Sequence, residues 1–169
     1  MHKDELPKVL SGVDTPFVVM SIGVPGSGKS TVLSELSEVT GIARISTDQI
    51  REELTGAEAD QSKNKEVWEE IYRRVQDSLA IGESVIVDAT HAEAFRRHDA
   101  VKMYRDMGAK TVLAVNFKVG LETAKERNKG RQRIVPDHAI ERMHKSLAKN
   151  PASTKEGFDE VIDIDEIQR

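Results

Sequence analysis

The sequence predicts an α/β domain with a central parallel sheet of about five strands flanked by helices. Short apolar runs rich in β-branched residues are typical of buried parallel strands, and they occur at Phe17–Ile22, Ala43–Ser46, Ser84–Asp88, Thr111–Phe117 and Glu160–Ile164. Helical patterns lie between them, at residues 29–39, 47–54, 63–81, 92–107, 121–127 and 136–149. In the third of these, Trp68 belongs to an apolar stripe, so we interpret it as a core residue. The alternation of the two element types indicates the fold class.

Length and composition indicate one domain. A chain of 169 residues is long enough to bury a core without covalent staples, and the absence of cysteine excludes a disulfide framework and any thiolate metal site. We expect residues 1–15 to be a flexible N-terminal tail and residues 16–169 to form a single domain. No run approaches the roughly 18 apolar residues that span a bilayer, so the sequence predicts a soluble, cytoplasmic protein without membrane partners.

Positive charge is concentrated in one part of an acidic chain. Residues 96–145 carry 13 basic and 6 acidic side chains, whereas the whole chain has a net charge of −4. This distribution favours an anionic ligand that is held locally. The alternative is that these basic residues lie on solvated helix faces. The pairs Arg73-Arg74 and Arg96-Arg97 could likewise contact an anionic acceptor or be solvated.

The segment GVPGSGKS after the first strand predicts a phosphate-binding loop, the P-loop of nucleoside triphosphate-binding proteins. Its glycines let successive backbone amides point inward, and the helix that begins at Lys29 adds positive partial charge. Lys29 supplies a charge for the β- and γ-phosphates, and the Ser30 hydroxyl is a ligand for Mg²⁺. We therefore assign ATP binding to Gly23, Pro25, Gly26, Ser27, Gly28, Lys29, Ser30 and Thr31.

Two classes of P-loop protein are disfavoured. The strand VIVDATH places alanine after Asp88, where a hydrolysing enzyme usually has glutamate. The guanine-reading pattern NKxD also fails, because in the segment that starts at Asn128-Lys129 the fourth position is Arg131 in place of aspartate. Transfer to an acceptor is therefore the preferred hypothesis.

Asp48 and Arg51 follow the second strand, three residues apart on one helical face. Ligands of open α/β sheets bind at strand ends, so both side chains can reach the P-loop. An aspartate there can accept the proton of an attacking hydroxyl, and an arginine can hold an adjacent anion. The alternative is that Thr47 or Asp48 caps the helix and Arg51 is solvated.

Arg127 and Arg131 lie four residues apart in ERNKGRQRIVP, before a helix that opens at Pro136. Glycine between arginines, followed by proline, is typical of a mobile basic lid that covers a transferred phosphoryl group. Arg133 fits a solvated role better, and the histidines show no metal-ligand spacing.

Taken in order, GVPGSGKS, STDQIREEL, VIVDATH, ERNKGRQRIVP and EGFDEVIDI resemble the kinase domain of the polynucleotide 5′-hydroxyl kinases of bacteriophage and bacterial end healing. The resemblance runs from about Phe17 to Ile164 and implies a nucleoside-kinase-like P-loop fold. A one-residue gap is needed to align the lid on Pro136. The pattern around Asp48 is shared in weaker form with zeta-toxin, gluconate and other small-substrate kinases.

The resemblance also implies roles for single residues. Asp48 corresponds to the general base and Arg51 to the arginine on the acceptor phosphate. Arg127 and Arg131 correspond to the lid arginines, and Asp88 with Thr90 lies near the acceptor pocket. The implied activity is transfer of the ATP γ-phosphate, with Mg²⁺, to 5′-hydroxyl ends of DNA or RNA.

Two alternatives stay open, a P-loop kinase of a small hydroxylated metabolite or nucleotide sugar and a nucleotide-binding regulator without transfer activity. The chain has no DxDGT phosphatase motif, so we expect 3′-end repair and ligation from separate proteins. No feature of the sequence specifies an oligomeric state.

Overall fold

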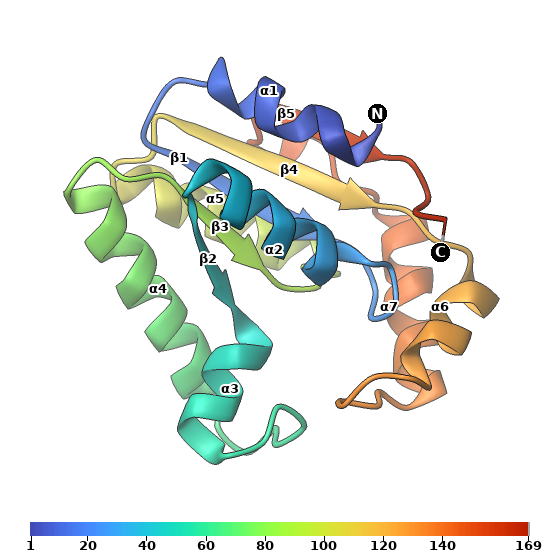
Figure 1. Cartoon of the computed structure of the whole chain (residues 1–169). Helices are drawn as coiled ribbons and strands as arrows, with labels where there is room; N and C mark the ends of the chain where they lie inside the picture. The colour runs from blue at the N-terminus through green and yellow to red at the C-terminus, as the bar shows by residue number, and fades with distance from the viewer. Residues whose placement is uncertain (169) are drawn as a thin grey trace.

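The computed structural model describes residues 1–168 and shows a five-stranded, all-parallel sheet between two helical layers (Figure 1). The strands β1 (Phe17–Ile22), β2 (Ala43–Ser46), β3 (Val85–Asp88), β4 (Thr111–Phe117) and β5 (Glu160–Ile164) have the spatial order β2-β3-β1-β4-β5. The helices are α1 (Leu6–Ser11), α2 (Lys29–Thr40), α3 (Thr47–Thr55), α4 (Asn64–Ala80), α5 (Ala94–Asp106), α6 (Leu121–Asn128) and α7 (Asp137–Lys149), with 3₁₀ turns at Lys3–Glu5 and Thr154–Glu156. The predicted fold class is confirmed, and every predicted strand lies within one residue of its observed position.

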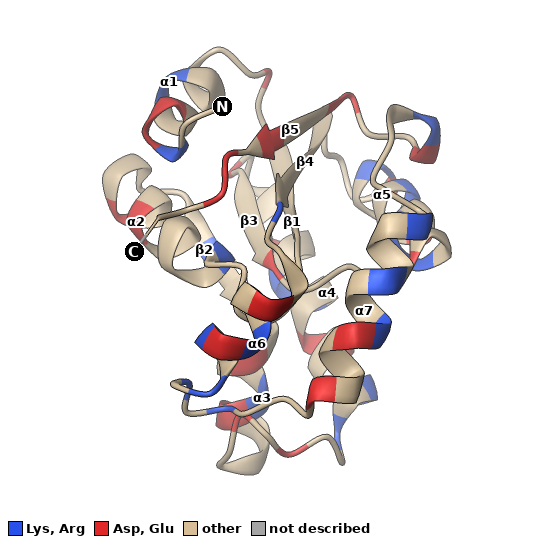
Figure 2. Cartoon of the chain, turned by 90° about the vertical axis from the view of Figure 1, so that its right-hand side faces the viewer, with Lys and Arg blue, Asp and Glu red and all other residues tan. Residues whose placement is uncertain are grey.

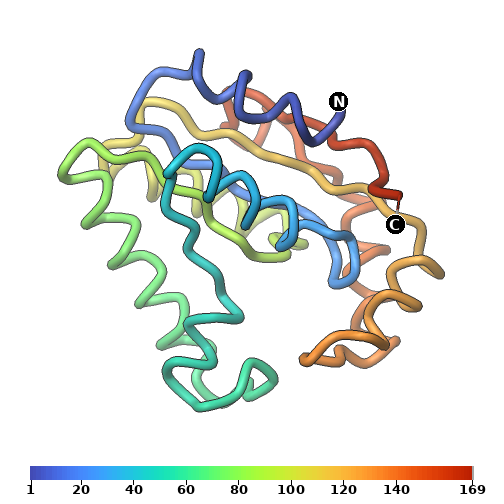
Figure 3. The backbone as a smooth tube through the Cα atoms, in the orientation of Figure 1, coloured from blue at the N-terminus to red at the C-terminus, as the bar shows by residue number. Residues whose placement is uncertain are grey.

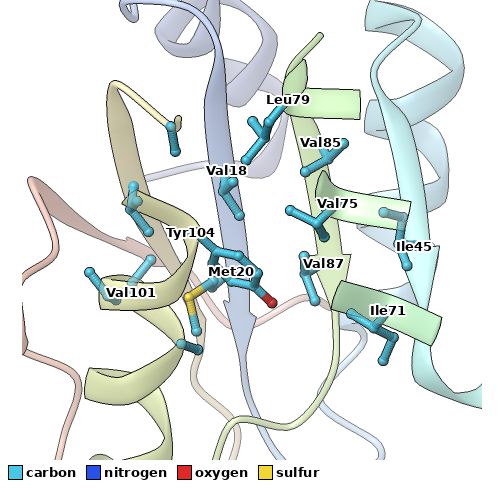
Figure 4. Packing of buried hydrophobic residues seen from close by; sticks show 14 of the residues in the cluster. Val18, Met20, Ile45, Ile71, Val75, Leu79, Val85, Val87, Val101 and Tyr104 are labelled. Carbon is cyan, nitrogen blue, oxygen red and sulfur yellow. The ribbon is translucent and has the colours of Figure 1, made fainter. Parts of the chain in front are cut away.

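Alternate residues of the strands pack against opposite helical layers. Val18 and Met20 of β1 face α4 and α5, where they meet Ile71 and Tyr104 (Figure 4). Phe17 and its alternate neighbours on β1 and β4 face α1 and α2. Because β1 lies in the middle of the sheet, all six of its residues are buried, which explains its continuous apolar sequence. Trp68, predicted as core, is partly buried and packs against the α4–α5 cluster.

The first residues pack on the fold, against our expectation of a flexible tail. Leu6 and Leu10 of α1 are buried in the cluster formed with α2 and the sheet. The ammonium group of Met1 donates to the carbonyl oxygen of Asp163 at 3.1 Å, which places the amino terminus beside the end of β5 (Figure 3). Leu6 and Leu10 are four residues apart and share one helical face, but a six-residue helix gives a weak sequence signal.

A third, smaller apolar cluster holds α6 and α7 against the loops after β1 and β4. It contains Val24, Val119, Ala124, Val135, Ala139 and Ile140. Val135 lies two residues before the start of α7, so the end of the lid segment is anchored in this cluster while the preceding residues are more exposed. The anchoring places the lid opposite α3, at the carboxyl ends of the strands (Figures 1 and 3).

Candidate active site

The P-loop turns tightly between β1 and α2. Gly26 and Gly28 have φ angles of +85° and +89°, a conformation that favours glycine. A Cβ atom on Gly26 would also overlap the carbonyl oxygen of Ala124, so α6 closes directly over the loop. Any side chain at Gly26 would force α6 and the loop apart, and the motif therefore serves both the backbone conformation and the packing.

Lys29 begins α2 and is only 7% exposed. Burial lowers the pKa of its ammonium group, and the charges of Arg131 and Arg133 act in the same direction, while Asp88 and Asp48 oppose them. A buried cation that faces other cations is stabilised by an added anion. The environment of Lys29 therefore favours a bound phosphate.

Asp48 stands in the first turn of α3 and is not the cap of that helix. Ser46 is the N-cap residue, and its hydroxyl accepts a bond from the amide of Gln49 at 3.4 Å. The capping alternative for Asp48 and Thr47 is therefore wrong, and the carboxylate of Asp48 is free to interact outside the helix. This correction strengthens the case for a functional carboxylate at the end of β2.

Three guanidinium groups surround the Asp48 carboxylate. Arg51 donates to it at 2.8 Å, Arg133 at 2.5 Å and Arg131 at 3.5 Å. Arg51 comes from the same helix, whereas Arg131 and Arg133 come from the lid. The Asp48 side chain is 21% exposed. The structure thus brings the predicted base and lid together.

Arg51 is buried, in contrast to the solvated alternative. It is 6% exposed and also donates to the side-chain oxygen of Asn64 at 3.3 Å and to the carbonyl oxygen of Glu58 at 3.4 Å. Burial lowers the pKa of Arg51, although the guanidinium stays charged beside Asp48. In this conformation Arg51 holds the Asp48 carboxylate without itself lining the pocket.

Arg44 holds Asp88, a contact that the sequence analysis did not identify. Both Nε and Nη2 of Arg44 donate to Oδ2 of Asp88, at 2.9 and 2.6 Å, and Asp88 is 3% exposed. The two residues lie on adjacent strands, because Ser46 of β2 is in register with Asp88 of β3. The alternation of strand residues places Arg44 and Ser46 on the same face, which is the signal that could have revealed the pair.

The lid arginines differ from the predicted pair. Arg127 donates to the carbonyl oxygen of Ile167 at 2.6 Å and does not line the pocket that holds Asp48. Arg133, which we expected to be solvated, lines that pocket together with Arg131. The reason is geometric, since Arg131 and Arg133 lie in an irregular, bent segment, whereas residue 127 lies on a helix and its side chain bonds the C-terminal segment.

A buried asparagine fixes the two ends of the lid. The side chain of Asn128 donates to the carbonyl oxygen of Val135 at 2.7 Å and accepts from the amide of Val135 at 3.0 Å. Asn128 is 1% exposed. This two-way bond ties together the two ends of residues 129–134, which form a loop between α6 and α7.

His91 has a structural role that its sequence context did not indicate. Its backbone has a φ of +48°, and its Nδ1 bonds the carbonyl oxygen of Ser21 at 2.5 Å. Burial lowers the pKa of His91 to about 4, so the ring is neutral at neutral pH. Arg97, fully buried, donates to the carbonyl oxygen of His91 and forms an ion pair with Glu156. These contacts fix the loop that follows Asp88.

The pocket at the carboxyl ends of the strands is lined by seven of the fourteen predicted site residues. Its open volume is about 20 Å³, enough for about one water molecule, so in this conformation the lid arginines leave little room beside Asp48. Thr31 is exposed, and Gly23, Gly26, Ser27 and Gly28 belong to the loop without lining this pocket. The lining residues are Pro25, Lys29, Ser30, Ser46, Thr47, Asp48, Asp88, Ala89, Thr90, Arg131 and Arg133.

Comparison with known proteins identifies the family. A family model described as "AAA domain" matches residues 18–150, from β1 to the end of α7. The chain belongs to this AAA domain family. The matched residues include the P-loop, Asp48, Asp88 and the lid, so this AAA domain contains the complete pocket.

Solved structures show the fold of this AAA domain to be that of P-loop kinases. A chain of the Pnkp1/Rnl/Hen1 RNA repair complex superposes with a TM-score of 0.73 at 24% identity, over 87% of this chain and 47% of that chain. A gluconokinase from Sinorhizobium meliloti 1021 superposes with a TM-score of 0.60 at 19% identity, over 91% of this chain and 85% of that chain. The resemblance to polynucleotide kinases is thereby confirmed for the fold, which small-substrate kinases share.

An adenylate kinase from Thermosipho melanesiensis is 38% identical over 74 residues, which are 43% of this AAA domain chain and 29% of that protein. The chain thus spans less than a third of this relative and less than half of the RNA repair chain. Together with the P-loop, these similarities support phosphotransferase activity for the AAA domain.

The pocket of this AAA domain fits a magnesium nucleotide. The Ser30 hydroxyl and the Asp88 carboxylate are hard oxygen donors, which Mg²⁺ prefers, and Mg²⁺ in kinases takes few protein ligands because substrate phosphates supply others. Within residues 1–168 no group of three or more acidic or histidine side chains forms a metal site of its own. No helix of the described residues is long and apolar enough to cross a bilayer.

Proposed function

We propose that this protein is a polynucleotide 5′-hydroxyl kinase that transfers the γ-phosphate of ATP to the 5′-hydroxyl end of DNA or RNA. The observation that carries the proposal is the position of Asp48, which shares one pocket with the P-loop lysine and two lid arginines. A carboxylate beside a phosphate cradle is suited to an alcohol acceptor, because it can take the proton of the attacking hydroxyl.

The residues divide the reaction between them. Asp48 accepts the proton of the 5′-hydroxyl, whose oxygen attacks the γ-phosphorus while the bond to the β–γ bridging oxygen breaks and ADP leaves with that electron pair. Lys29 and Arg131 neutralise the charge on the transferred group, and Arg133 lies where it can do the same. When bound on Ser30, Mg²⁺ adds charge neutralisation at the β- and γ-phosphates.

The lid contacts add a requirement for movement. Arg131 and Arg133 occupy the oxygens of Asp48 that an acceptor hydroxyl would need. We propose that the ATP phosphates draw both arginines away and so expose the base. Arg51 donates to Asp48 and keeps the carboxylate oriented, and we propose that it also holds the phosphate next to the acceptor hydroxyl. Arg127 takes part in this scheme only if the lid rearranges away from Ile167.

Charge and the RNA repair likeness favour a polynucleotide acceptor. The residues in and directly behind the pocket are five cations (Lys29, Arg44, Arg51, Arg131 and Arg133) and two carboxylates (Asp48 and Asp88). This excess of positive charge suits an acceptor that brings phosphate of its own, in addition to ATP. The second candidate is a small-metabolite kinase, which is supported by the gluconokinase superposition over most of both chains.

A transfer assay separates the two candidates. The protein is incubated with γ-labelled ATP, Mg²⁺ and 5′-hydroxyl DNA or RNA oligonucleotides, beside gluconate, nucleosides and nucleotide sugars. The matched controls are the same oligonucleotides with 5′-phosphate ends and the Lys29→Ala variant. We expect label only on the 5′-hydroxyl oligonucleotides. Label on a metabolite but not on any oligonucleotide would overturn the polynucleotide proposal, and label on no acceptor would favour a regulator.

A further inference from the structure

The outer face of α7 carries a row of unpaired basic residues, defined by Arg142, Lys145 and Lys149 and called here the α7 basic face. All three side chains are exposed, and none lies within 4.0 Å of a carboxylate among residues 1–168. Figure 2 shows basic residues along the later turns of α7. The nearest acidic neighbour in sequence, Glu141, points to α6, where it pairs with Lys125 at 2.5 Å.

The arginines on the exposed faces of α4 and α5 are neutralised within the protein. Arg73 pairs with Glu70 and Asp77, Arg96 pairs with Glu93, and Arg105 pairs with Asp159. The pairs Arg73-Arg74 and Arg96-Arg97 therefore serve the fold, which removes them as candidate ligand contacts. The α7 basic face remains as an unneutralised row on an acidic protein, and it is suited to an anionic partner.

Ser146 joins the α7 basic face to the loop after β3, which reaches the pocket at Thr90. The hydroxyl of Ser146 donates to the carbonyl oxygen of Ala92 at 2.9 Å, and Ala92 lies two residues after Thr90, which lines the pocket. Arg142 lies four residues before Ser146 and Lys149 three residues after it, so both are its neighbours on the helix surface. The two cations therefore flank the contact between α7 and the pocket loop.

We propose that the α7 basic face binds the sugar–phosphate backbone of the acceptor strand beyond its 5′ end. This inference rests on the proposed function and extends it from the reacting end to the body of the polynucleotide. Arg142 and Lys149 are seven residues apart, or about 10 Å along the helix axis. That length matches about three phosphate steps of 3.4 Å in a duplex-like strand. Point charges in such a row bind backbone without selecting sequence.

The test compares two double variants. Arg142→Ala/Lys149→Ala removes two cations that flank Ser146, and Lys8→Ala/Lys110→Ala removes two exposed, unpaired cations on α1 and before β4. Alanine keeps α7 helical, so the fold is preserved. For each protein the acceptor KM and kcat are measured with a long single-stranded oligonucleotide and with a nucleoside 3′-monophosphate, over a range of salt concentrations.

We expect the α7 variant to lose affinity only for the long acceptor. Each lost phosphate contact with a single strand reduces the steepness of log affinity against log salt concentration by about 0.7. For each such contact, lowering the salt from 1 M to 0.1 M therefore improves KM about fivefold less in the variant than in the unaltered protein. The KM for the nucleoside 3′-monophosphate and both kcat values should match the control variant. Equal KM and salt slope in the two double variants would overturn the inference while leaving the kinase proposal intact. Absence of transfer to any polynucleotide by the unaltered protein would overturn both.

Discussion

Replacing Asp48 with asparagine separates the proposed chemical role of the carboxylate from its structural role. Asparagine keeps the shape and one side-chain oxygen, so Arg51 retains an acceptor at the position where it now bonds Asp48 at 2.8 Å. The substitution removes the negative charge and the ability to accept a proton in the reaction. Removing a general base lowers the rate by about 10² to 10⁴, which corresponds to about 2.7 to 5.4 kcal/mol in the barrier.

The surrounding charges predict what the same variant does to nucleotide binding. Without the carboxylate, Lys29, Arg51, Arg131 and Arg133 face the pocket with Asp88 as their remaining anion. Affinity for ATP should therefore be retained or increased, which isothermal titration can measure. The lost lid pairs should cost little stability, because the Arg131 and Arg133 side chains are 27% and 20% exposed and such pairs contribute at most about 1 kcal/mol each. The larger loss should come from Arg51, whose side chain is 7% exposed and would face a neutral amide in place of the carboxylate.

Three measurements then decide the role of Asp48. Single-turnover transfer to the acceptor reports the chemical step, titration reports ATP affinity, and thermal unfolding reports stability. We expect a rate loss of at least about 10² with ATP affinity preserved. A rate within about threefold of the unaltered protein would refute the assignment of Asp48 as the base. Lost ATP affinity together with a large drop in melting temperature would show that the carboxylate acts mainly in the fold.

Three further predictions address other parts of the site. Lys29→Met should weaken ATP binding and reduce transfer at least about 10²-fold while leaving the circular dichroism spectrum unchanged, because the pocket loses its central phosphate cation. Arg133→Ala should lower kcat more than Arg127→Ala does, and the reverse order in steady-state assays would restore the pair predicted from sequence. Stability should fall as the pH drops from 6.5 towards 4, because His91, whose pKa is about 4 when folded, takes up a proton more readily in the unfolded chain. The contribution of His91 to this loss is at most about 1.4 kcal/mol of unfolding free energy per pH unit. The His91→Gln variant should lack that contribution, which melting curves recorded at several pH values can measure.

Periodicity predicted the sheet well, because a parallel sheet imposes a simple pattern. The strands β1 and β3 are buried on both faces, so their apolar runs stand out between turns and helices. The P-loop was equally clear, since its glycines are required by backbone geometry and by the contact of Gly26 with α6. The short helix α1 was missed because two buried leucines within six residues are too little periodicity to distinguish a helix from a tail.

The site was predicted less completely because its contacts cross between elements. The sequence showed Asp48 and Arg51 three residues apart, but the bonds from Arg131 and Arg133 join residues more than eighty positions apart. The choice of Arg127 relied on a spacing of four, which describes a helix, whereas the lid after Asn128 is irregular. The Arg44–Asp88 pair depends on strand order, which a single sequence does not specify.

The ion pairs of the pocket fall into a fixed class and a movable class. Asp88 is 3% exposed and the Arg51 side chain is 7% exposed, so breaking the pairs Arg44–Asp88 or Arg51–Asp48 would leave a buried charge uncompensated. The lid pairs of Asp48 are more exposed and hold correspondingly little free energy. Because guanidinium–phosphate bonds are charge-assisted and can be bidentate, an arriving triphosphate can outcompete Asp48 for the lid arginines. The fixed pairs then keep the two carboxylates in place while the movable pairs exchange a carboxylate for a phosphate.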